Sequence, residues 1–95
     1  MPDPIQRPDF RVVLRILEVL WRNATPMRRT RLQQASGTNY TQFERYLDLL
    51  VARGLVELRA GDEGGVSVAL TPKGFEAHQF LVKGLRDLFS ERSLG

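Results

Sequence analysis

The stretch NYTQFERYLDLLVARGLVE, residues 39–57, has the pattern of a capped amphipathic helix followed by a strand. Asn39 is a favoured helix N-cap, and Gly54 is a favoured helix end because glycine readily adopts the left-handed conformation. Apolar residues recur at steps of three and four, which predicts a buried stripe. The stripe consists of Tyr40, Phe43, Leu47 and Leu50, with Tyr46 and Val51 at its edges.

Three polar residues of this helix, Thr41, Gln42 and Arg45, fall outside the buried stripe. One interpretation is that they form the solvated side of an ordinary helix, with Gln42 bonding back to the backbone of Asn39 in a capping box. The other is that they form a recognition surface. The elements on either side of the helix favour the second interpretation.

Two helices are predicted upstream. The first spans roughly residues 9–23 with Asp9 as N-cap, and its apolar stripe is Phe10, Val13, Leu14, Leu17, Leu20 and Trp21. The second spans roughly residues 26–35, with Thr25 as cap, Pro26 at the first helical position and Gly37 at the end. Its expected inward residues are Met27 or Thr30, Leu32 and Ala35.

A β-hairpin and a last helix are predicted downstream. The segments LVELRA (55–60) and VSVALT (66–71) are strand-like and are joined by the glycine-rich turn GDEGG. Thr71 and Pro72 then open a helix that should run to about Ser90. Two short helices split by a glycine turn and followed by a hairpin predict a winged helix-turn-helix, an α+β and mainly helical fold. We expect a tail at 1–8, the winged domain at 9–71 and a C-terminal helix at 72–95.

In such a fold the second helix of the pair enters the DNA major groove. Thr41, Gln42 and Arg45 are therefore predicted to contact bases, since arginine pairs with guanine and glutamine with adenine. The formal net charge is +3, and arginine makes up twelve of the fourteen basic residues, which suits phosphate contact unless it reflects genome composition. The predicted phosphate contacts are Arg28, Arg29, Arg31, Asn39, Arg53 and Arg59. Asp62 and Glu63 at the wing tip would repel phosphates.

Other classes of function are disfavoured. The chain has no cysteine, a single histidine, no glycine-rich phosphate loop and no nucleophile elbow, so we expect neither an enzyme nor a metal site. No cofactor or small-molecule ligand is evident. No apolar run approaches the ~18 residues of a membrane span, and the N-terminus lacks a signal-peptide core, so a cytoplasmic, nucleoid-associated protein is expected.

The segments YTQFERYLDLLVARGLVE and LTPKG resemble the small archaeal winged-helix regulators, a group that includes ArnR-like transcription factors and nucleoid-associated proteins. The first motif is matched by Tyr40, Phe43, Tyr46, Leu47, Leu50, Gly54 and Leu55, and the second by Leu70, Thr71, Lys73 and Gly74. The resemblance implies a homodimer through the last helix, commonly as an antiparallel coiled coil.

The last helix supports a dimer independently, because it carries two apolar stripes. His78, Val82, Leu85 and Phe89 have coiled-coil spacing, and Phe75, Leu81 and Leu88 lie beside them. Alternatively, both stripes form one wide intramolecular face. The sequence therefore predicts a homodimeric regulator that binds specific double-stranded DNA. The alternatives are an architectural chromatin protein or a winged helix that binds proteins instead of DNA.

Overall fold

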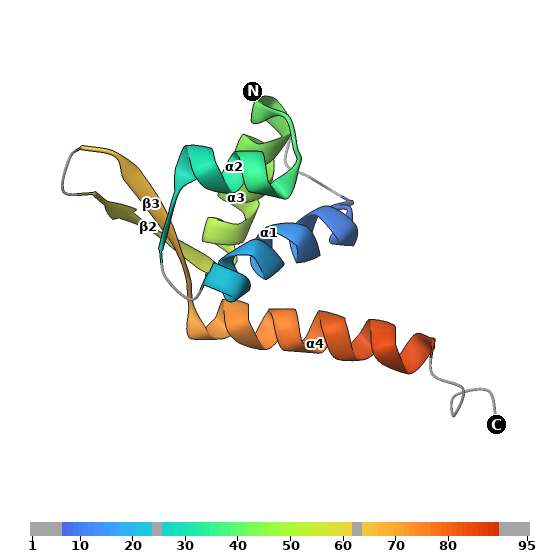
Figure 1. The fold of residues 1–95 in the computed structure, drawn as a ribbon. Helices are drawn as coiled ribbons and strands as arrows, with labels where there is room; N and C mark the ends of the chain where they lie inside the picture. The colour runs from blue at the N-terminus through green and yellow to red at the C-terminus, as the bar shows by residue number, and fades with distance from the viewer. Residues whose placement is uncertain (1–6, 24–25, 62–63, 90–95) are drawn as a thin grey trace.

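The computed structural model describes residues 7–23, 26–61 and 64–89 and confirms the predicted four helices and hairpin, with one added strand. Within these residues the order is α1 (Phe10–Asn23), β1 (Met27–Arg28), α2 (Arg29–Ser36), α3 (Tyr40–Ala52), β2 (Val56–Ala60), β3 (Val66–Leu70) and α4 (Pro72–Leu88). Figure 1 shows the β2–β3 hairpin projecting from one end and α4 running along α1 toward the other. This is the architecture of a winged helix-turn-helix.

The sheet contains a strand that the sequence did not predict. Its strand order is β1-β3-β2 with antiparallel pairing, and Met27 lies opposite Val68. Pro26 was expected to open a helix, but the chain stays extended and α2 begins only at Arg29. Pairing with β3 places Met27 in the core, where its side chain is buried. Thr25, the expected cap, lies outside the described residues.

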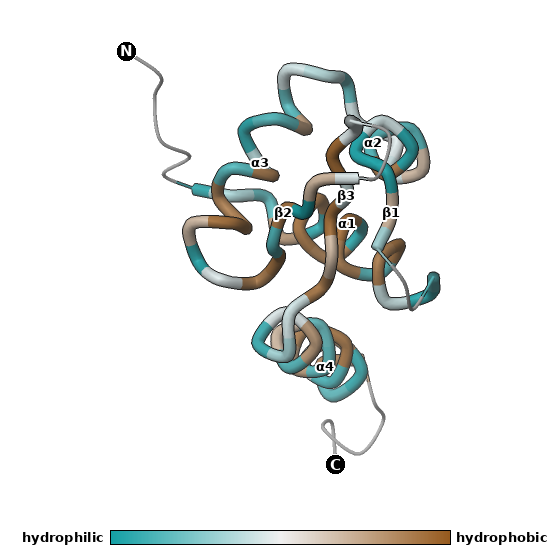
Figure 2. Tube along the Cα trace, turned by 90° about the vertical axis from the view of Figure 1, so that its left-hand side faces the viewer, coloured by the Kyte–Doolittle hydropathy of each residue, from teal (hydrophilic) through white to brown (hydrophobic). Residues whose placement is uncertain are grey.

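The buried face of α1 is rotated from the predicted one. Phe10 is 64% exposed and Trp21 is 42% exposed, whereas Val12 and Ile16 are buried. Apolar residues surround most of this helix, so their spacing alone does not select a face. Contacts with α2, α3, α4 and β3 make the selection. Figure 2 shows α1 and β3 as the apolar centre of the fold, with α4 as a separate layer beside them.

Helix α3 is anchored in the core by Phe43, Tyr46, Leu47 and Leu50. Tyr46 is buried, and its hydroxyl accepts a hydrogen bond of 2.8 Å from the backbone N–H of Asp9. Tyr40, by contrast, is 62% exposed, so its predicted place in the core is wrong. It is the first residue of α3, and helical side chains lean toward the N-terminus, away from the core beneath the later turns.

Helix α2 has a smaller buried face than predicted. Leu32 is buried as expected, whereas Thr30 and Ala35 are exposed and Ser36 is buried instead. The Ser36 hydroxyl donates to the carbonyl of Gln33 at 3.0 Å, which satisfies a polar group that would otherwise be costly to bury.

Helix α4 is fastened at its start. Thr71 accepts a hydrogen bond of 3.0 Å from the N–H of Gly74, as expected of an N-cap, and donates one of 2.6 Å to the carbonyl of Gly54. A Cβ built on Gly74 would overlap the carbonyl oxygen of Leu55, so only glycine permits this close approach. The first turn of α4 is therefore held against the segment that joins α3 to β2.

Candidate nucleic-acid interface

The turn between α2 and α3 is held by polar contacts within the turn and by one from α1. Gly37 has φ of 70°, the predicted left-handed helix end. The hydroxyls of Ser36 and Thr38 are 3.2 Å apart, and Arg15 of α1 donates to the carbonyl of Ser36 at 3.2 Å. An arginine at a helix C-terminus is favourable because the helix dipole is negative there. Asn39 then caps α3 by accepting from the N–H of Gln42 at 2.8 Å.

The outer face of α3 begins directly after this cap. Thr41 and Arg45 are exposed, whereas Gln42 is half-buried. Among the described residues the Gln42 side chain makes no return bond to Asn39, so only half of the predicted capping box is formed. Tyr40 is exposed beside these three residues, and sequence reasoning missed it because its spacing matched the core stripe. The start of α3 thus presents two hydroxyls, an amide and a guanidinium.

The three arginines near the start of α2 have different surroundings. Arg29 pairs with Glu44 of α3 through two hydrogen bonds, one of them 2.9 Å between Nε and Oε2. The bond to Glu44 is the main cause that raises the pKa of Arg29 above its usual value, and Tyr40 adds to it. Both side chains are about two-thirds buried. Arg29 therefore joins α2 to α3, a contact that no sequence spacing indicated.

Arg28 and Arg31 point elsewhere. A Cβ on Gly65 would overlap the Arg28 guanidinium, so this side chain lies against the turn end of the wing, just before β3 begins. Arg31 is exposed on α2 and forms no ion pair with any residue that the structure describes. The expected cluster of three cations at one helix start is therefore divided among the wing, the α2–α3 contact and the surface.

Two further arginines lie beyond the helix-turn-helix. Arg53 is exposed at the C-cap of α3. Arg59 is half-exposed on β2 and is paired with Glu57, with 2.6 Å between Nη2 and Oε1. The predicted acidic wing tip, Asp62 and Glu63, lies outside the described residues. Within 26–61, exposed arginines therefore lie near the start of α2, at the C-terminal end of α3 and on the wing.

The residues expected to form a dimer seam on α4 differ in exposure and fall into three groups. Phe75, Leu85, Leu88 and Phe89 are exposed, and Leu81 and Val82 are half-buried. His78 is only 2% exposed, so it does not face a surface that a partner could contact. Its Nε2 lies 2.9 Å from Oε1 of Glu18, and its ring stacks on Trp21 with 5.1 Å between centroids. His78 belongs to the packing of α4 on α1.

An apolar groove lies beside these α4 residues. It has a volume of about 390 Å³ and is lined from α1 by Phe10 and Leu14 and from α4 by Phe80, Leu81, Leu85 and Leu88. Phe80 is 76% exposed, and neither Phe80 nor Phe10 was predicted as an interface residue. Phe10 was predicted to lie in the buried stripe of the first helix, and Phe80 was assigned to neither apolar stripe of the last helix.

The described residues hold no group of three or more potential His, Cys, Asp or Glu metal ligands. In the same part of the chain, no helix is long and apolar enough to cross a membrane.

A family model for winged helix-turn-helix proteins matches residues 6–90, nearly the whole chain. The chain belongs to this family. No curated protein matches the sequence significantly. The winged helix-turn-helix assignment therefore rests on the family model together with the fold.

Several solved structures are similar to this winged helix-turn-helix. A MarR family transcriptional regulator from Silicibacter pomeroyi is 33% identical with a TM-score of 0.66, over 80% of this chain and 54% of that one. The M. tuberculosis transcriptional regulator MosR, solved in complex with DNA, is 26% identical with a TM-score of 0.69, over 88% and 61%. The DNA-binding protein Sso10a-2 from Sulfolobus solfataricus, at 22% identity, a TM-score of 0.67 and coverage of 92% and 90%, shows the fold alone. The chain spans about half the length of the Silicibacter regulators.

Proposed function

We propose that this protein is a homodimeric transcriptional regulator that binds specific sequences in double-stranded DNA, rather than an enzyme. The observation that carries this proposal is the outer face of α3. There Thr41 and Arg45 are exposed with no side-chain partner among the described residues, while the helix beneath them is held by its cap and by the Arg29–Glu44 pair. A rigid helix with unengaged polar side chains near its start is what reading base edges requires.

The base contacts follow from side-chain chemistry. Arg45 can pair with the two acceptors of guanine, and Thr41 can contact a base or a phosphate. Gln42 can reach adenine with its amide, although its side chain is partly buried within the protein. Tyr40 joins this set as an exposed aromatic residue next to Thr41.

The phosphate contacts need a revised assignment. Arg31 is exposed near the start of α2, and Arg53 is exposed at the C-terminal end of α3. Each can therefore contact a phosphate of the DNA backbone beside the major groove that α3 enters. Arg28 and Arg59 lie on the wing side, and Asn39 is exposed at the turn although its Oδ1 is used in capping. Arg29 is engaged with Glu44, so we assign it to positioning α3 rather than to contacting phosphate.

The dimer is proposed to form through α4. Phe80, Leu85 and Leu88 expose apolar surface along the groove with α1, and monomeric proteins rarely leave a large contiguous apolar patch in water. A second copy related by a two-fold axis would cover the same residues on both chains. Such a dimer would present two α3 helices to two half-sites of DNA.

The relatives in the winged helix-turn-helix fold support regulation, since two of them are described as transcriptional regulators and one of these was solved with DNA. The architectural alternative shares every contact residue and differs only in the ratio of specific to random DNA affinity. The protein-binding alternative predicts no duplex binding even at low salt. A regulator of this kind would act in the cytoplasm at the nucleoid.

Selection of bound sequences from random duplexes distinguishes these three functions in one experiment. A regulator enriches a motif with two-fold symmetry, an architectural protein binds without enrichment, and a protein-binding module recovers no DNA. In gel shifts, Arg45→Ala should lower the preference for the selected site by about tenfold, the scale of one lost base contact. Arg53→Ala, the matched control on the same helix, should weaken selected and random duplexes equally. Equal loss of preference in both variants would refute the assignment of Arg45.

A further inference from the structure

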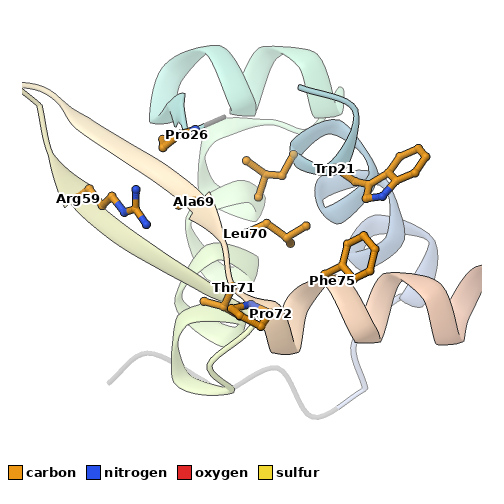
Figure 3. Close-up of a pocket in the computed structure, with 9 residues that line it drawn as sticks. Trp21, Pro26, Arg59, Ala69, Leu70, Thr71, Pro72 and Phe75 are labelled. Atoms are coloured by element: carbon orange, nitrogen blue, oxygen red, sulfur yellow. The ribbon is translucent and has the colours of Figure 1, made fainter. Parts of the chain in front are cut away.

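A second cavity lies at the other end of the contact between α1 and α4 from the apolar groove. It opens where the C-terminal end of α1, the base of the wing and the first turn of α4 meet (Figure 3). Its volume is about 530 Å³. Cavities that hold small organic molecules have volumes of roughly 300–1,000 Å³. This cleft is therefore large enough for a small ligand.

The lining of the cleft is apolar at one end and charged at the other. Trp21 and Phe75 place two aromatic rings on one side, and Figure 3 shows Arg59 on the far side beyond Leu70. Arg59 is the only charged residue among the described residues that line the cleft. A ligand that matches this lining carries an apolar body and an anionic end, separated by several bonds.

The aromatic wall is held in place from behind. Trp21 stacks on His78 with 5.1 Å between ring centroids and 22° between planes. His78 is 2% exposed and lies 2.9 Å from Oε1 of Glu18. The Trp21 ring therefore has a fixed neighbour on one face. Because the Trp21 side chain is already held in one conformation, binding a ligand against it costs less conformational entropy.

The position of Phe75 is fixed by the start of α4. Its backbone N–H bonds to the carbonyl of Thr71 at 2.8 Å, and the Thr71 hydroxyl bonds to Gly54 at 2.6 Å. The close approach of Gly74 to Leu55 prevents this turn from sliding. Both rings of the cleft are thus mounted on rigid parts of the fold.

At the charged end of the cleft, Arg59 can exchange its present partner, Glu57, for a ligand carboxylate. Arg59 is paired with Glu57, but the two side chains are 55% and 52% exposed. An ion pair as exposed as this contributes little to stability, so a ligand carboxylate can share or replace Glu57 at small cost. A planar guanidinium favours a carboxylate because it can donate two parallel hydrogen bonds.

We propose that this cleft binds an elongated apolar carboxylic acid, with its carboxylate on Arg59 and its apolar body against Trp21 and Phe75. A bound acid would bridge β2 of the wing and the first turn of α4. The proposal concerns this cleft alone and does not depend on DNA binding.

Trp21 is the only tryptophan of the chain, so its fluorescence reports directly on the cleft. The full chain, without DNA, is titrated with 4-phenylbutyrate and separately with its neutral isostere, 4-phenylbutanamide. The acid should give a saturable change with a dissociation constant of about a millimolar, as expected for a ligand of this size. The acid should bind about fivefold more tightly than the amide, the upper range for an exposed ion pair. Equal binding of both compounds, or no saturable change, overturns the proposal.

Three variants assign the contacts. Arg59→Gln should reduce the affinity for the acid to that for the amide, and Phe75→Ala should weaken both compounds. Arg86→Gln removes an exposed arginine of α4 outside the cleft and should change the binding of neither compound. Circular dichroism confirms that each variant is folded. If the Trp21 fluorescence instead changes with protein concentration but not with added acid, a second copy covers the cleft and the proposal is wrong.

Discussion

Arg29 at the start of α2 holds Glu44 of α3 through two hydrogen bonds, one of them 2.9 Å from Nε to Oε2. The pair connects the two helices of the helix-turn-helix on the side away from the Gly37 turn. Each side chain is about two-thirds buried, so water screens the attraction only in part. Arg29 thereby helps to set the angle between α2 and α3.

Replacing Arg29 should affect stability, whereas replacing Arg31 should affect DNA binding. Arg29→Ala should lower the free energy of unfolding by about 1 kcal/mol, because it leaves a partly buried carboxylate without its partner. Arg31→Ala should change stability by less than about 0.5 kcal/mol but reduce the salt dependence of DNA affinity by about 0.9 per lost phosphate contact. Urea unfolding and gel shifts at several salt concentrations measure both quantities. A loss of salt dependence in Arg29→Ala equal to that in Arg31→Ala would return Arg29 to the phosphate contacts.

Two glycines of α4 provide a matched test of how that helix is docked. A Cβ on Gly74 would overlap the Leu55 carbonyl and come within 2.8 Å of Cδ1 of Leu70, whereas a Cβ on Gly84 meets nothing within 4 Å. Gly74→Ala should therefore lower the free energy of unfolding by about 2 kcal/mol, as overpacking does. Gly84→Ala should raise it by up to about 1 kcal/mol through helix propensity. Urea unfolding of both variants measures the difference. Equal stabilisation by the two substitutions would show that α4 is not held against Leu55.

The parts of the fold that were predictable from sequence are those set by local chemistry. Asn39 and Thr71 cap their helices as expected, and Gly37 has the left-handed conformation that its place after α2 requires. Each of these contacts spans three residues or fewer. The glycine-rich segment likewise joins β2 and β3 as expected.

The errors arose where a distant segment decides the structure. Met27 is in a strand because it pairs with Val68 of β3, which lies 41 residues later in the chain. No local signal marks so short a strand. Tyr40 has core-like spacing but lies at the end of its helix, beyond the core. His78 has coiled-coil spacing but is covered by Trp21 and Glu18 of α1. Periodicity identified the apolar faces without identifying what covers each one.

The contact between His78 and Glu18 should make stability depend on pH in the acid range. Its hydrogen bond is the main cause that lowers the pKa of Glu18 below the ordinary value of 4.5, and Arg22 contributes as well. The native state therefore binds fewer protons at this site than the unfolded chain. Its contribution to stability is present above pH 4.5 and is lost as the pH falls through the lowered pKa.

Two variants that remove this hydrogen bond should therefore approach the stability of the parent as the pH falls. Glu18→Gln and His78→Phe each remove the hydrogen bond, the second while keeping an aromatic ring against Trp21. Each should be less stable than the parent at pH 6, and the difference should shrink below pH 4.5. Urea unfolding at a series of pH values measures it. A difference that stays constant down to pH 3 would mean that the contact does not perturb Glu18.

The groove between α1 and α4 decides whether the proposed homodimer forms where we place it. Phe80 and Leu85 are exposed on its α4 side, so a charge there costs the monomer little but would be buried in a dimer. Leu85→Glu and Phe80→Glu should each yield monomers in analytical ultracentrifugation at concentrations where the parent is a dimer. Their free energies of unfolding, extrapolated to low protein concentration, should lie within about 0.5 kcal/mol of the parent.

Gln79→Glu is the control for this test, because it introduces the same charge at an exposed α4 residue that does not line the groove. It should remain a dimer. The monomeric variants should also bind a selected two-fold site only as weakly as a single half-site, since the second α3 is no longer linked to the first. A parent protein that stays monomeric at all concentrations would refute the homodimer. A dimer that survives both groove variants would instead place the contact on another part of the surface, such as the one around Phe75 and Trp21, which are also exposed.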